Sequence, residues 1–301
     1  MRAQSTAGLA LTSFATAAAA AAIEAALRPR SAAPLPAPER SAAATRLNGA
    51  SALLATAALA DSAVEHYRGA FHNKNMILPL MVSAQALGAS LHGATDRAAR
   101  SNSTRDLGQA LALVTGVVGT GFHFYNVLKR PGGWSWLNLF YAAPLGAPVA
   151  LSLAGMLGGI AERLRGSRVL FGYLPGRLIA RLVSLGLLGA SGEAALLHFR
   201  GAYHNPAMVI PVTAPPVAAA LLTGATLCPR LAQPASLALK ALTGVGLLGA
   251  ALHAYGIQRN MGGWRNWSQN ILNGPPLPAP PAFTALAIAG LAALKLIERE
   301  K

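Results

Sequence analysis

Apolar residues along this chain gather into long runs, and short connections between the runs hold most of the arginine. A helix needs about 20 apolar residues to cross the ~30 Å hydrocarbon core of a bilayer. Eight runs approach that length, at 47–65, 76–92, 108–128, 142–161, 179–198, 207–227, 236–257 and 280–296. Barrel strands would instead alternate over about ten residues. The pattern predicts an all-α integral membrane protein with eight spans.

A further apolar run, rich in alanine, precedes these eight at residues 8–27, and a linker of proline, alanine and arginine follows it. A cleaved signal peptide is one interpretation, and it would invert the orientation of the whole chain. We expect instead an uncleaved N-terminal hydrophobic helix that spans the membrane or lies along it.

Composition agrees with a membrane protein. Of 301 residues, 53% are hydrophobic and 12% are charged, against about 25% charged in an average soluble domain. The formal net charge of +15 comes from arginines in short connections, which is typical of charges that set topology rather than of a nucleic-acid surface. We therefore expect the lipid bilayer as partner, with other membrane or redox subunits, and no nucleic acid. Cys228 is the only cysteine, which excludes an internal disulfide and a thiolate metal site.

Lysine and arginine are unevenly divided between the two faces that alternate along such a chain. They are more numerous in the N-terminal linker, in the connections after the second, fourth and sixth spans, and in the C-terminal tail. Basic loops favour the cytoplasmic side. The sequence thus predicts a multi-pass protein of the cell inner membrane with the opposite loops extracytoplasmic.

One of those opposite loops carries HYRGAFHN (66–73), and HFRGAYHN (198–205) repeats it 132 residues later. In the same order, TGVVGTGFHFY (115–125) resembles TGVGLLGAALHAY (243–255), and GGWSW (132–136) resembles GGWRNW (262–267). The matches predict two tandem four-helix transmembrane repeats, which are parallel because each has an even number of spans. The expected division is 1–46, the hydrophobic segment and linker; 47–165, the first repeat; 166–177, a basic cytoplasmic connector; and 178–301, the second repeat with a short charged tail.

Polar residues survive at matched positions of the two repeats, and these are the candidate site residues. They are His66/His198, His72/His204, His123/His253, Arg68/Arg200, Asn73/Asn205 and the carboxylates Asp61/Glu193. An ionisable group inside a span is costly and usually functional or paired. Arg68 is the expected partner of Asp61, as Arg200 is of Glu193.

Helical periodicity suggests how these residues are displayed. Asp61, Arg68 and His72 would share one polar face if their helix continued through Gly69. Gly116 and Gly119 share a face with His123, and small residues at that spacing let helices approach closely. With the equivalent face that ends at His253, they would let the two repeats meet across a pseudo-twofold axis and share one outward-facing site.

The first functional hypothesis is redox: a b-type haem or a metal ion bound by neutral imidazoles for electron transfer. His123 and His253, on equivalent helices, would be the axial pair, with Arg68 and Arg200 beside the propionates. His66 and His198 are further cofactor-binding candidates. A separate metal site would use His72, His204, Asp61 and Glu193.

Two alternatives remain open. A transporter of an anionic or proton-coupled solute would use the arginines to attract an anion and the carboxylates and histidines to relay protons. Pro211, Pro215 and Pro216 would interrupt one span, as at many transporter sites. In a noncatalytic membrane subunit, the arginines and histidines would instead only reach the headgroups. The sequence does not identify a catalytic residue, and enzymatic activity stays undecided.

Overall fold

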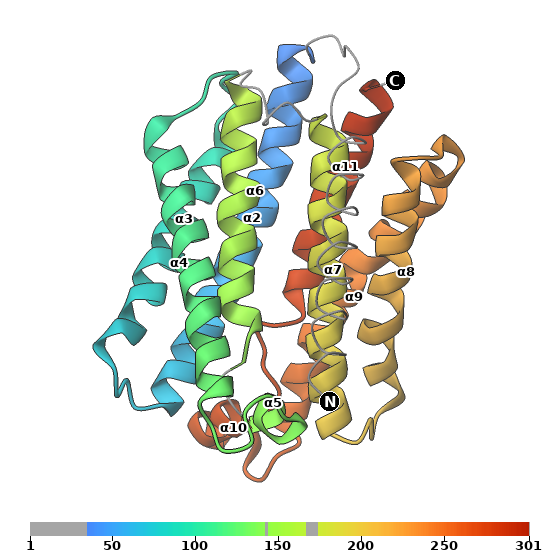
Figure 1. Ribbon diagram of the computed structural model, residues 1–301. Helices are drawn as coiled ribbons and strands as arrows, with labels where there is room; N and C mark the ends of the chain where they lie inside the picture. Colours follow the sequence, from blue (N-terminus) through green and yellow to red (C-terminus); the bar gives the residue numbers. More distant parts are fainter. Residues whose placement is uncertain (1–34, 142–143, 167–173, 301) are drawn as a thin grey trace, which may run out of the picture.

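The computed structural model describes residues 35–141, 144–166 and 174–300, and Figure 1 shows its helices. Within these ranges the chain has helices and no strand, as predicted. The expected N-terminal helix at 8–27 and most of the connector 166–177 lie outside the described residues.

Each of the eight predicted spans corresponds to a long helix. In the first half these are α2 (Ala37–Arg68), α3 (Leu78–Thr95), α4 (Ser103–Leu128) and α6 (Gly146–Arg165), and in the second half α7 (Pro175–Arg200), α8 (Ile210–Ala225), α9 (Ala232–Gln258) and α11 (Pro281–Arg299). The short helices are α5 (Trp136–Tyr141), α10 (Trp267–Asn273), η1 (Lys74–Ile77), η2 (Pro206–Val209), η3 (Pro229–Leu231) and η4 (Gly263–Asn266).

Seven of the long helices, some extended by a neighbouring 3-10 turn, are apolar and long enough to cross a membrane. The exception is α6, whose last turn holds Glu162, Arg163 and Arg165 and is correspondingly less hydropathic. The prolines of α8, Pro215 and Pro216, lie inside a helix that continues past them. The predicted interruption of this span is therefore absent.

Corresponding helices pack in the same pairs in both halves. Helix α2 contacts α3 and α6 as α7 contacts α8 and α11, and α4 contacts α6 as α9 contacts α11. The two halves meet mainly where α2 packs against α11, with a smaller contact between α6 and α7. Helices α3 and α4 therefore flank one side of the molecule and α8 and α9 the other (Figure 1).

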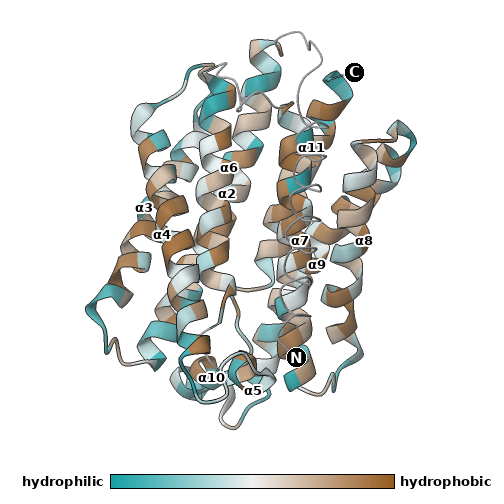
Figure 2. Cartoon of the chain, viewed as in Figure 1, coloured by the Kyte–Doolittle hydropathy of each residue, from teal (hydrophilic) through white to brown (hydrophobic). Residues whose placement is uncertain are grey.

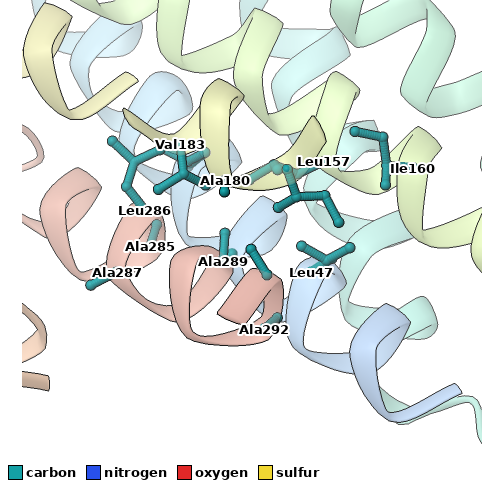
Figure 3. Close-up of a cluster of buried hydrophobic side chains, with 14 of the residues drawn as sticks. Leu47, Leu157, Ile160, Ala180, Val183, Ala285, Leu286, Ala287, Ala289 and Ala292 are labelled. Atoms are coloured by element: carbon teal, nitrogen blue, oxygen red, sulfur yellow. The ribbon is translucent and has the colours of Figure 1, made fainter. Parts of the chain in front are cut away.

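Alanine and leucine fill the centre, where the halves meet. Figure 3 shows Leu47 and Leu157 of the first half beside Ala180, Val183 and Ala289 of the second. Small side chains allow the close helix approach that packs membrane bundles. Large apolar side chains cover the outward faces of α4 and α9, among them the exposed Val114, Phe122 and Leu247, and polar residues concentrate at the two ends (Figure 2).

The two ends differ in content and are named here by it. The motif end holds α5, α10 and the turns 69–73 and 201–205; the basic end holds the starts of α2, α4 and α7 and the ends of α6 and α11. At the motif end α2 stops at Arg68, and Ala70 and Phe71 have positive φ angles of 52° and 47°. The predicted polar face from Asp61 through Gly69 to His72 is therefore wrong, because the backbone turns before His72.

Candidate functional site

All six paired histidines lie at the motif end and point one ring nitrogen at a backbone carbonyl. The Nδ1 atom of His66 lies 2.6 Å from the Met76 oxygen and that of His198 lies 2.9 Å from the Met208 oxygen. His123 makes the same kind of contact with Pro144. The partners of the other three are Pro276 for His253 at 2.6 Å, Gly69 for His72 at 3.0 Å and Gly201 for His204 at 3.0 Å.

These contacts determine which nitrogen is free. A carbonyl oxygen only accepts hydrogen bonds, so each Nδ1 must carry the proton and donate it. In a neutral imidazole Nε2 is then the atom that binds a proton or a metal ion. The four half-buried rings, at positions 66, 123, 198 and 253, are held by this bond between a span and the segment that follows it.

The histidines group by half rather than across the axis. His66 and Glu65 are close enough to His123 to interact with it electrostatically, and His198 interacts in the same way with His253. Glycine explains part of this arrangement. A Cβ at Gly249 would lie 2.7 Å from the Cβ of Pro280, and one at Gly119 would lie 3.2 Å from that of Pro148. The predicted glycine faces therefore pack α9 on α11 and α4 on α6, and the expectation that they join the two halves is wrong.

The matched carboxylates belong to different halves but lie within electrostatic range of each other. Asp61 interacts electrostatically with Glu193 as well as with Glu65. The carboxylate of Glu193 accepts a 2.8 Å hydrogen bond from the Gly146 backbone N–H at the start of α6. The free N–H groups and the dipole at a helix N-terminus favour such an anion.

Neither predicted carboxylate–arginine pair forms a direct salt bridge, although Arg68 acts on Asp61 electrostatically. Arg68 pairs with Glu65 at 2.6 Å, one turn earlier on the same helix face. Arg200 donates a 2.7 Å hydrogen bond to the Phe140 carbonyl and lies over the ring of Tyr141 at 5.8 Å. The reason is geometric: residues seven apart are two turns apart along the axis, whereas an i, i+3 neighbour or the adjacent α5 lies within reach.

Arg200 also shows that the motif end is built from both halves. Its contacts reach α5 of the first half, and the neighbouring Phe199 stacks on Phe140 at 5.9 Å. Together with the Glu193–Gly146 hydrogen bond, these contacts attach α7 to the segment that precedes α6. The four tryptophans are well exposed around this end, as expected of residues at the membrane interface.

Metal binding by the second predicted set is not supported by their placement. His72 and His204 are exposed and bonded back to their own turns. Over the described ranges, no group of three or more His, Cys, Asp or Glu side chains could hold a metal ion. Asp61 and Glu193 therefore do not join these histidines in one cluster, and the metal hypothesis stays a prediction.

A second polar cluster lies at the basic end, and sequence reasoning missed it. Arg105 forms two hydrogen bonds with Glu162, of 2.9 and 3.0 Å, and a third of 2.8 Å with Asp96. Arg165 donates to the carbonyls of Gly93 at 2.7 Å and Ala98 at 2.8 Å. The side chains of Arg105, Glu162 and Arg165 are 3%, 1% and 0% exposed.

Arg105 and Arg165 stand in or beside the basic connections whose charges the sequence analysis interprets as topology signals, and for these two arginines that interpretation is wrong because both are buried. Asp96, at the end of α3, shows the field they create: its pKa is lowered by the hydrogen bond from the Ala98 N–H and then by Arg105. A comparison of the halves could have found the cluster. At the positions equivalent to Arg105, Glu162 and Arg165, the second half has Ala235, Leu294 and Ile297.

Two surface cavities lie away from the histidines. One of about 300 Å³ at the basic end is lined by Ser101, Asp106 and Arg163 among others, and one of about 340 Å³ lies beside Phe122 and Tyr125 on α4. Comparison of the chain with protein-family models, curated proteins and solved structures found no match.

Proposed function

We propose that this chain is a proton-coupled membrane transporter made of two tandem, parallel four-helix repeats. The observation that carries the proposal is that a half-buried carboxylate recurs at the same position of the two repeats, as Asp61 and Glu193, with Glu193 within electrostatic range of Asp61. The paired histidines, each with one free nitrogen, lie toward the same end of these helices. Both carboxylates come from membrane-spanning helices, where ionisable groups mark proton and ion pathways.

Electrostatic repulsion between the two carboxylates favours protonation of one of them. Two carboxylates that share a site cannot both be charged without cost, and a nearby cation or proton relieves it. Arg68 and Arg200 are each occupied by another partner. A proton is thus the natural counter-charge for Asp61 and Glu193, and the Nε2 atoms of His66 and His198 are suited to deliver it.

The repeat is supported by bonds that recur at matched positions. Asn73 and Asn205 accept from the backbone two residues ahead, at 3.0 and 2.9 Å, and Asn138 and Asn270 each donate to a carbonyl of the glycine turn before them. The pairing of helices also recurs. One ancestral unit used twice would place equivalent groups at the same depth.

Proton entry into vesicles tests the proposal. The purified chain would be reconstituted with an internal pH dye, and small polar solutes would be added in turn under an inward proton gradient. At least one solute should accelerate proton entry in the native chain but not in Asp61→Asn or Glu193→Gln. Lys74→Ala, exposed at the same end, is the control that should behave as the native chain. Solute-driven entry that survives both carboxylate substitutions would refute proton coupling at this pair.

Redox chemistry remains a second candidate because of the Nδ1 contacts. Imidazoles that ligate iron or another metal usually donate their other N–H to a carbonyl or carboxylate, and His123 and His253 do so. By placement, the candidate ligand pairs are His66 with His123 and His198 with His253, in place of His123 with His253. Neither surface cavity described above has a histidine in its lining. A Soret band in the purified chain, lost in His123→Ala, would favour this candidate, and its absence would exclude haem.

A further inference from the structure

A row of buried polar side chains connects helices α2, α3 and α4 of the first half, in the part of these helices nearer the basic end. Ser51 of α2 shares a 2.8 Å hydrogen bond with Ser90 of α3, and Gln109 of α4 donates to Ser90 at 2.9 Å. Asn48, one turn from Ser51, completes the row toward the buried ion cluster of Arg105, Glu162 and Arg165. The side chains of all four row residues are fully buried.

The row contains more hydrogen-bonding atoms than the protein satisfies. Neither the nitrogen nor the oxygen of the Asn48 side-chain amide has a hydrogen-bond partner. The same is true of Oε1 of Gln109 and of the hydroxyl of Ser83, which lies two turns before Ser90 on α3. A buried polar atom without a partner loses its hydrogen bonds to water and gains none in return. Buried polar groups in proteins are normally hydrogen-bonded, and an unpaired one points to water or a ligand.

Glycines accommodate these amides. A Cβ at Gly93 would lie 2.6 Å from Cγ of Asn48, and one at Gly158 would lie 2.6 Å from Nε2 of Gln109. Any larger residue would displace the amides from their positions between the helices. At Gly93 of α3 and Gly158 of α6 the backbone is therefore shaped around polar groups.

The second half provides an internal comparison, because its interior is apolar at every equivalent position. Asn48, Ser51, Ser90 and Gln109 correspond to Ala180, Val183, Leu222 and Leu239, all of them buried. Ala180 and Val183 belong to the apolar cluster of Figure 3. The second half keeps the same helix pairs with apolar residues at these four positions, so the architecture does not require the row.

We propose that the first half contains the solute path, lined by Asn48, Ser51, Ser90 and Gln109, and that the second half has no equivalent path. The path takes a small solute without net charge that both donates and accepts hydrogen bonds, together with water. Neutral amides and hydroxyls line it, and the charges at its basic end balance, since Arg105 and Arg165 face Glu162 and Asp96. The inference that a solute moves along the row rests on the proposed function. The inference that water reaches the row does not.

Cysteine accessibility at matched positions tests the proposal. Ser90→Cys and Leu222→Cys would each be made with Cys228→Ser and reconstituted into vesicles. Both would be treated with 2-hydroxyethyl methanethiosulfonate, a small neutral reagent that reacts with a thiolate. Because a thiol in dry apolar surroundings stays protonated, Ser90→Cys should react at least about tenfold faster than Leu222→Cys. Equal, slow reaction at both positions would overturn the proposal.

A second pair keeps the test valid if Ser90→Cys fails to fold. Ser51→Cys and Val183→Cys occupy another matched position in helices α2 and α7 and should differ in the same direction. Any solute that drives proton entry should also slow the labelling of the first-half cysteine. If no solute drives proton entry but the first-half cysteine still reacts faster, the transport proposal fails while the hydrated row stands. If a solute drives proton entry and does not protect the cysteine, the path lies elsewhere.

Discussion

Arg105 and Arg165 show that the role of a charged residue in this chain depends on its surroundings and not on its place near a loop. Both lie in or beside short basic segments, yet both are buried and bonded within the first half. Glu162 contacts both arginines and also accepts from the Asn102 N–H at 2.8 Å. Removing one member of such a cluster leaves the others without compensation, which costs more than removing the cluster as a whole.

The second half supplies the residues for this test. Glu162→Leu introduces the residue found at Leu294 and should lower stability by about 3–5 kcal/mol, because buried Arg165 loses its counter-charge and buried Arg105 keeps only Asp96. The triple variant that adds Arg105→Ala and Arg165→Ile should be more stable than Glu162→Leu alone, because it removes the buried guanidinium groups and leaves unpaired only the more exposed Asp96. Thermal unfolding in detergent would measure both. A triple variant less stable than the single one would show that the cluster is held by something other than mutual charge compensation.

In both halves, glycine lets a long helix, α4 or α9, pack closely against the next span. A Cβ at Gly116 would lie 2.6 Å from the Pro148 carbonyl oxygen, and one at Gly246 would lie 2.8 Å from that of Pro280. In each half the glycine face brings a long helix onto the first turn of the next span, beside the histidine that bonds to the preceding segment. The elements that position His123 and His253 are therefore fixed by small residues, not by large ones.

Alanine substitutions test this packing with internal controls. Gly116→Ala and Gly246→Ala should each destabilise the fold by about 1–3 kcal/mol, because an added methyl group overpacks a tight contact. Gly121→Ala and Gly244→Ala lie on the same two helices with nothing within 4 Å of the added Cβ. These controls should be neutral or stabilising by up to about 1 kcal/mol, since alanine favours helix over glycine. Melting temperatures that do not separate the two groups would contradict the contact.

At the scale of the whole molecule, the two halves share one arrangement of helices but differ in the side chains of their interiors. The halves share their helix pairs and the turns of the motif end, but the buried ion cluster and polar row belong to the first half. The orientation of the molecule follows from charge: lysine and arginine favour the cytoplasmic side, which predicts that the basic end faces the cytoplasm. The native Cys228 is exposed between α8 and α9 at the basic end. Its chemical labelling therefore shows which side of the membrane that end faces.

An impermeant maleimide applied to intact cells tests the orientation. Native Cys228 should stay unlabelled until the membrane is opened, because it lies at the basic end. Lys74→Cys in a Cys228→Ser background, exposed in η1 at the motif end, should be labelled from outside. Labelling of Cys228 alone in intact cells would reverse the orientation and support a cleaved N-terminal signal.

The sequence by itself determined the helices and the residues worth comparing. Each of the eight expected segments contains most of a long helix, because hydropathy over a span-length window is a local property of the chain. The comparison of matched positions singled out the six histidines and the Asp61/Glu193 pair before any contact was known. It also contained the signal for the polar row, since Asn48 and Gln109 correspond to Ala180 and Leu239.

Only the tertiary structure decided which groups meet. Arg68 bonds to Glu65 and not to Asp61, the glycine faces join helices within each half, and Glu193 contacts the start of α6. The physical reason is that lipid and protein interior are equally apolar. A face turned to lipid and a face turned to a neighbouring helix therefore look alike in hydropathy, and the partners of a polar side chain become defined only when the helices pack.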